Sequence, residues 1–296
     1  ISIIHIIILT GSTCTGGQGK IDLELIFVIA LLITGSGVGL ASGMLGVGGC
    51  FIMIPVQYWA LTSMGFDSKI AILVAFGTNL LVVLPTALSG AYRHSKKKAV
   101  LWRPAAVMGI SGGIASMLGV FMATQLSGNL LTVIFGLVII ASAVRMLTAK
   151  PPKGEENPPE NDLLYVLAGL PLGFLCGLIG IGGGVLMIPV MVVGLKFSMH
   201  KAVGTSTALM AFISLFASIC YMAYGWGASG LPANSIGYVN MLQFLLLAAT
   251  SVPMAQVGAH VAHRIPAKQL KHVFIIVMVY MGIKMTGLFS WMGLPL

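Results

Sequence analysis

Long uncharged apolar runs recur along the chain and are separated by short polar loops. The runs 71–92 and 238–261 contain no Asp, Glu, Lys or Arg. About 20 apolar residues in a helix cross the roughly 30 Å hydrocarbon core of a bilayer. The pattern therefore predicts an all-α polytopic membrane protein. Its simple spans are expected at about residues 69–91, 102–123, 129–149, 201–224, 239–262 and 267–290.

Two further apolar segments, 24–61 and 163–195, contain a glycine cluster near their middle. As one helix, the first segment would be about 55 Å long at 1.5 Å per residue, far longer than a bilayer requires. Glycine allows the backbone to turn sharply without a Cβ clash. We expect each segment to break at its cluster and to form a broken or re-entrant helical hairpin.

The two glycine clusters belong to an internal repeat. Gly39-Leu-Ala-Ser-Gly-Met-Leu-Gly-Val-Gly-Gly-Cys-Phe-Ile-Met-Ile-Pro55 aligns without gaps on Gly173-Phe-Leu-Cys-Gly-Leu-Ile-Gly-Ile-Gly-Gly-Gly-Val-Leu-Met-Ile-Pro189. Downstream, Phe76-Gly-Thr-Asn79 corresponds to Val203-Gly-Thr-Ser206. The chain is therefore predicted to be a tandem duplication.

The duplication divides the chain into four parts. Residues 24–149 and 163–296 form the two transmembrane repeats. Residues 150–162 hold four prolines and four of the seven acidic residues, which predicts a solvated cytoplasmic linker. Residues 1–23 form an N-terminal segment, interpreted as a truncated helix or a signal-peptide remnant.

Loop charges predict how the repeats are oriented. The basic loops 93–103, 196–201 and 263–271 fall on one side with the linker, whereas the uncharged loops 124–129 and 225–238 fall on the other. Lys and Arg are enriched in cytoplasmic loops. This arrangement requires each broken hairpin to return to the side that it entered from, so each repeat crosses the membrane three net times. An odd number of crossings places the two repeats in opposite orientations, and we expect two inverted-topology repeats.

Composition narrows the classes of function. Hydrophobic residues make up 57% of the chain and charged residues 8%, against about a quarter charged in soluble domains. The net charge of +9 lies in short loops, so no nucleic-acid partner is expected. The four cysteines lack CxxC spacing, and the HExxH motif is absent. We expect a lipid-embedded protein that is not an enzyme and binds no metal or cofactor.

The glycine clusters are also the strongest candidate for a binding site. A half-helix that begins inside the membrane presents free N–H donors and the positive end of its dipole, which favours a small anion. The candidates in the clusters are Gly48, Gly49, Cys50, Gly182, Gly183 and Gly184. The more widely spaced glycines 35, 39, 43, 169, 173 and 177 are interpreted as helix-packing stripes instead.

Polar residues in otherwise apolar spans add further candidates. Thr78, Asn79, Thr205, Ser206 and Thr207 occur at matching places in the two halves. Each hydroxyl could instead bond to a carbonyl of its own helix. All seven acidic residues lie in loops or at span ends, which disfavours a cation substrate because a buried cation needs a counter-charge.

The paired Gly-x-x-Gly-x-Gly-Gly-(Gly/Cys)-x-x-x-x-Pro motifs, with the Gly-Thr-Asn and Gly-Thr-Ser triplets, resemble the sulfite exporter TauE/SafE family over about residues 25–290. The resemblance implies a bacterial or archaeal plasma-membrane secondary transporter of small sulfur-containing anions, such as sulfite or an organosulfonate like sulfoacetate. It also allows a homodimer. A passive anion channel and a carrier of another small organic anion are the alternatives. Cys50 departs from the family's third glycine and Asn79 from its usual serine.

Overall fold

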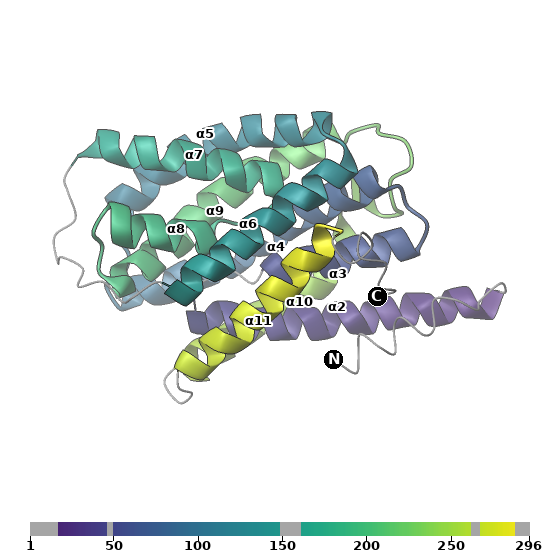
Figure 1. The fold of residues 1–296 in the computed structure, drawn as a ribbon, viewed down its shortest axis with the longest axis horizontal. Coiled ribbons are helices and arrows are strands. Elements are labelled where there is room, and N and C mark those ends of the chain that lie inside the picture. The colour runs from purple at the N-terminus through teal and green to yellow at the C-terminus, as the bar shows by residue number, and fades with distance from the viewer. Residues whose placement is uncertain (1–16, 46–49, 149–160, 262–266, 288–296) are drawn as a thin grey trace.

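The computed structural model describes residues 17–45, 50–148, 161–261 and 267–287, which fold almost entirely into helices (Figure 1). The first repeat contains α2 (Gly17–Leu45), α3 (Cys50–Ser63), α4 (Ser68–Lys96), α5 (Trp102–Gln125) and α6 (Gly128–Thr148). The second contains α7 (Asp162–Ile179), α8 (Gly184–Pro189), the π-helical turn η1 (Val190–Gly194), α9 (Met199–Tyr224), the strands β1 (Ser235–Ile236) and β2 (Val239–Asn240), α10 (Met241–Val261) and α11 (Ala267–Met285).

The helices confirm the polytopic all-α prediction. Within the described residues, α4, α5, α6, α7, α9 and α10 are long and apolar enough to cross a membrane. The predicted span 267–290 corresponds to helix α11, Ala267–Met285. The antiparallel pair of two-residue strands β1 and β2 was not predicted.

Both long apolar segments are broken. In the first repeat α2 ends at Leu45 and α3 begins at Cys50; Gly48 and Gly49 lie outside the described residues. Helix α2 starts at Gly17, within the stretch assigned to the N-terminal segment. In the second repeat α7 ends at Ile179, and α8 begins at Gly184.

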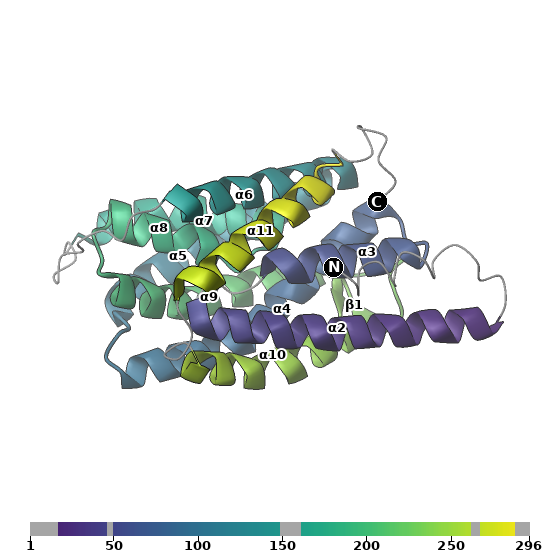
Figure 2. The same cartoon turned by 60° about the horizontal axis from the view of Figure 1, so that its bottom comes forward.

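The widely spaced glycines pack helices together, as predicted, and their contacts join helices of one repeat to helices of the other. Gly39 of α2 lies on the backbone of Ser251 in α10, and these helices run side by side in Figure 2. In the second repeat Gly173 of α7 lies on the backbone of Gly112 in α5. A Cβ at either glycine would overlap that backbone. Corresponding helices of the two halves therefore make corresponding contacts.

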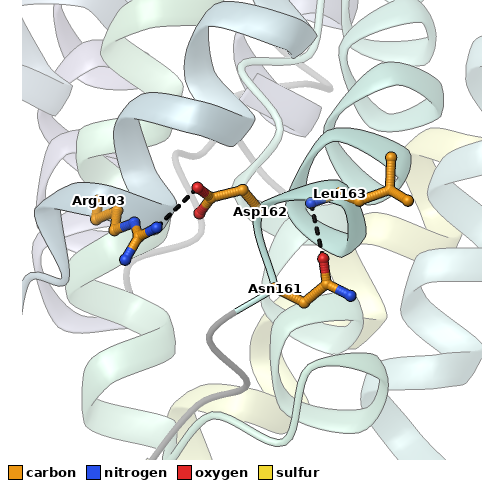
Figure 3. A network of polar contacts seen from close by, with 4 residues as sticks. All are labelled: Arg103, Asn161, Asp162 and Leu163. Atoms are coloured by element: carbon orange, nitrogen blue, oxygen red, sulfur yellow. Dashed lines mark hydrogen bonds and ion pairs between the residues drawn. The ribbon is translucent and has the colours of Figure 1, made fainter.

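The connections gather at two opposite ends of the bundle. Arg103 at the start of α5 forms an ion pair of 2.8 Å with Asp162 at the start of α7 (Figure 3). Asn161 accepts the Leu163 N–H at 3.0 Å and so caps α7 in the same network. Both ionic side chains are largely exposed, so this pair contributes at most about 1 kcal/mol. The ion pair shows that the basic loop 93–103 lies beside the end of the linker.

The other connections also lie at one or the other of these two ends of the bundle. Arg93 near the end of α4 donates to the Gln256 carbonyl in α10 at 3.0 Å, which adds that helix to the basic end. At the opposite end, Gly128 at the start of α6 lies on the backbone of Lys69, and Gly230 of the α9–α10 connection approaches Ile70. Which end faces the cytoplasm, and the inverted orientation of the repeats, stay predictions.

Candidate functional site

Asn79 of α4 lies at the centre of the candidate site, against the break between α7 and α8. Its side chain is fully buried, and its Nδ2 donates to the Gly180 carbonyl at 2.7 Å across 101 positions of sequence. A carbonyl oxygen only accepts hydrogen bonds. The contact therefore fixes which end of the amide faces the break.

Cys50 brings the break of the first repeat to the same place. It is the first residue of α3 and is fully buried. Its thiol lies within hydrogen-bonding range of the Asn79 side chain and of the Gly182 backbone. Cys176 of α7 belongs to the same buried cluster. Three predicted site residues from three separate segments of the two repeats thus meet, namely Cys50, Asn79 and Gly182. We call this meeting point the junction.

The junction is closely packed around its glycines. A Cβ at Gly182 would approach the Val83 side chain to 2.6 Å, and a Cβ at Gly183 would lie 3.0 Å from the Cys176 sulfur. The Tyr221 hydroxyl of α9 donates to the Gly177 carbonyl at 2.9 Å, at the end of α7. Small residues in the break thus allow α4 and α9 to approach its backbone.

Thr78 contacts a different part of the molecule from its neighbour Asn79. Its Oγ1 accepts the backbone N–H of Asn240 at 2.9 Å. One residue earlier, Gly77 lies directly on the Tyr238 carbonyl. The Gly77–Thr78 pair of α4 therefore holds β2 and the start of α10.

Thr205 makes the corresponding contact in the second repeat. Its Oγ1 accepts the backbone N–H of Leu101 at 3.1 Å, and Gly204 lies on the Ala99 carbonyl. The pair holds the start of α5, the counterpart of α10. We call these two arrangements the Gly–Thr clamps. They show that both threonine hydroxyls have structural partners in the opposite repeat.

The remaining hydroxyl candidates bond to their own helix. Ser206 donates to the Val203 carbonyl at 2.9 Å, and Thr207 donates to the Gly204 carbonyl at 2.7 Å. This is the alternative that the sequence analysis left open for such residues. Gly184 is buried at the first position of α8, next to the junction.

Gln57 of α3 is a buried polar residue whose role the sequence leaves undecided. Its side chain is fully buried, and within the described part of the chain neither its Nε2 nor its Oε1 has a hydrogen-bond partner. Seven residues after Cys50, it lies on the same face of α3 two turns further along. An amide within an apolar helix was the available signal, but its lack of partners became visible only in the fold.

We expect Gln57→Leu to stabilise the protein by about 1–3 kcal/mol, because it removes two buried polar atoms without hydrogen bonds and keeps a similar volume. Thermal unfolding in detergent would measure the change. Ser214→Ala is a matched control, since Ser214 Oγ is also buried without a partner but is a single atom. A lower unfolding temperature for Gln57→Leu would contradict the prediction.

The two acidic side chains that the structure describes lie at helix starts. Asp67 accepts the Lys69 N–H at 2.9 Å at the start of α4, and Asp162 lies at the start of α7. Arg145 near the end of α6 is exposed. In the same part of the chain no group of His, Cys, Asp and Glu is arranged to hold a metal ion.

Six long apolar helices among the described residues, together with two broken helices, are the arrangement found in multi-pass membrane transporters. The chain belongs to the sulfite exporter TauE/SafE family, whose sequence profile matches residues 31–285. The resemblance noted from the paired glycine motifs is therefore confirmed. Its relatives come from bacteria and archaea, which accords with a multi-pass protein of the plasma membrane.

Curated relatives cover nearly the whole chain. It is 28% identical over 270 residues to a probable membrane transporter protein of Methanocaldococcus jannaschii, with 90% of this chain and 98% of the relative aligned. It is 28% identical to the probable membrane transporter protein YunE of Bacillus subtilis, with 89% and 99% aligned. A probable membrane transporter protein of Haemophilus influenzae is 23% identical, with 88% and 98% aligned. No solved structure matches the chain significantly.

Proposed function

We propose that this protein is a secondary transporter that moves small sulfur-containing anions, such as sulfite or an organosulfonate like sulfoacetate, across the plasma membrane. The observation that carries the proposal is the junction. There Cys50 at the start of α3 lies against Asn79 and the Gly182 backbone, so both broken helices meet at one buried polar residue of α4. The family to which the chain belongs supports the substrate class.

The chemistry of the junction suits an anion. The first N–H groups of a helix have no acceptor inside that helix, and the positive end of its dipole lies there. A dipole end contributes about 0.3–1 kcal/mol toward an anion when exposed and up to about 2 kcal/mol when partly buried. With a few hydrogen bonds, such donors give micromolar to millimolar affinity. A modest affinity suits a carrier that must release its substrate. A homodimer remains our expectation for the assembly.

Counterflow in proteoliposomes tests the proposal. Vesicles preloaded with unlabelled sulfite should take up radiolabelled sulfite faster than empty vesicles, because a carrier returns more quickly when it is loaded. A passive anion channel would show no such acceleration. Acceleration by another organic anion, with none by sulfite or sulfonates, would support the alternative carrier.

The junction is tested by Gly184→Leu, which places a large side chain at the buried first position of α8. We expect counterflow to fall at least tenfold. Gly194→Leu is the matched control, because Gly194 ends η1, is exposed and has only Val190 within ordinary contact distance. Normal counterflow in Gly184→Leu, with both variants monodisperse on gel filtration, would remove the junction from the transport path.

A further inference from the structure

The Asn79 amide has one end in use and one end open. Its Nδ2 is committed to the Gly180 carbonyl at 2.7 Å, which excludes the flipped amide because two oxygens would then face each other. Its Oδ1 is buried and has no hydrogen-bond partner among the described residues. The junction therefore contains an acceptor of fixed orientation.

Neighbouring groups do not supply the missing donor. The Asn79 side chain is fully buried, and an unpaired buried carbonyl is a costly exception in folded proteins. Ser206, which corresponds to Asn79 in the repeat, donates to its own helix at Val203. The Cys50 thiol lies beside the amide, but no hydrogen bond satisfies Oδ1. Among the described residues no group donates to Oδ1, so this acceptor is open to a ligand that carries a donor.

We propose that Asn79 Oδ1 selects substrates that carry a hydrogen-bond donor as well as an anionic head. The inference rests on the proposed function and narrows its substrate class: singly protonated sulfite stays in that class, whereas sulfoacetate, a dianion without a donor at neutral pH, falls outside it. A singly protonated oxyanion or a hydroxy- or amino-substituted sulfonate meets both demands. A fully deprotonated dianion, or a sulfonate with a plain alkyl group, meets only the first, because its remaining surface would face the partial negative charge of Oδ1.

Two sulfonates of matched size isolate this effect. Hydroxyethanesulfonate and propanesulfonate have the same number of non-hydrogen atoms and both remain monoanions at every pH of interest, but only the first has an O–H donor. Isothermal titration calorimetry on the purified protein should show about tenfold tighter binding of hydroxyethanesulfonate, the size expected for one buried hydrogen bond.

Asn79→Ser is the decisive variant, because it installs the residue that the second repeat has at Ser206, and a hydroxyl can donate or accept. We expect the preference to fall below about threefold. Ser218→Ala is the matched control: Ser218 is buried in α9 and bonds its own helix at Leu215, so the tenfold preference should persist.

The outcomes separate the two proposals. Equal binding of both sulfonates to the unaltered protein would overturn the donor requirement and leave the anion site in place. An unchanged preference in Asn79→Ser would overturn the assignment to Asn79. Binding of neither sulfonate, with no binding of sulfite, would overturn the donor requirement and the proposed function together.

Discussion

The double variant Thr78→Val Thr205→Val is expected to lose about 2–6 kcal/mol of stability and to unfold at a clearly lower temperature. Each valine keeps the shape of threonine but removes the oxygen that accepts a backbone N–H, from Asn240 in one clamp and from Leu101 in the other. A buried donor left without its acceptor costs about 1–3 kcal/mol. The clamps lie at different helix starts, so the two losses should add.

Thermal unfolding in detergent, supported by hydrogen exchange at Leu101 and Asn240, would measure this effect. The control is Thr78→Ser Thr205→Ser, which keeps both acceptor oxygens and should stay close to the parent. An unfolding temperature equal to the parent's, together with lost sulfite binding, would contradict the structural role. It would instead favour the interpretation drawn from the sequence, in which both hydroxyls contact substrate.

The repeated patterns made much of the fold predictable. Apolar runs gave the helices α4, α5, α6, α9 and α10 within a few residues of their bounds, because hydrocarbon requires long stretches without charge. Glycine spacing identified the packing faces of α2 and α7, since small residues at every fourth position allow helix backbones to touch. The same alignment of glycines located both breaks.

The partners of polar side chains were not predictable in the same way. From the sequence, Thr78 and Asn79 form one polar pair, yet a helix turns by about 100° per residue and sends them to different neighbours. Thr78 meets Asn240, and Asn79 meets Gly180. Both partners come from the other repeat, more than a hundred residues away. Periodicity within one helix carries no information about which distant backbone group will lie beside it.

Gln57 is a residue whose role could not be chosen from the sequence. Nothing in the pattern around it distinguishes a helix-packing group from a binding group, because an amide can serve as either. Its complete burial and its two unpartnered atoms depend on the face of α3 that meets the bundle. The candidate site could therefore be placed at the glycine breaks from sequence, whereas its polar members had to be sorted by the fold.

The largest single-residue effect is expected at Gly180, the residue that directly follows α7. Its φ of +64° lies in the left-handed region, where a side chain costs about 1–2 kcal/mol. A Cβ there would also lie 2.6 Å from the Phe76 Cα in α4, so the helix backbone itself would have to shift. Overpacking of this kind adds about 1–3 kcal/mol.

Gly180→Ala should therefore destabilise the protein by about 2–5 kcal/mol and should abolish counterflow, because displacing α4 separates Asn79 from the Gly180 carbonyl. Gly65→Ala separates the cost of backbone strain from the cost of overlap with α4. Gly65 has a φ of +88° in the turn between α3 and α4, and nothing lies within 4 Å of the added Cβ. That variant should cost only the backbone term of about 1–2 kcal/mol and keep transport. Equal losses in the two variants, measured by thermal unfolding, would mean that contact with α4 contributes nothing and that the junction tolerates a wider break.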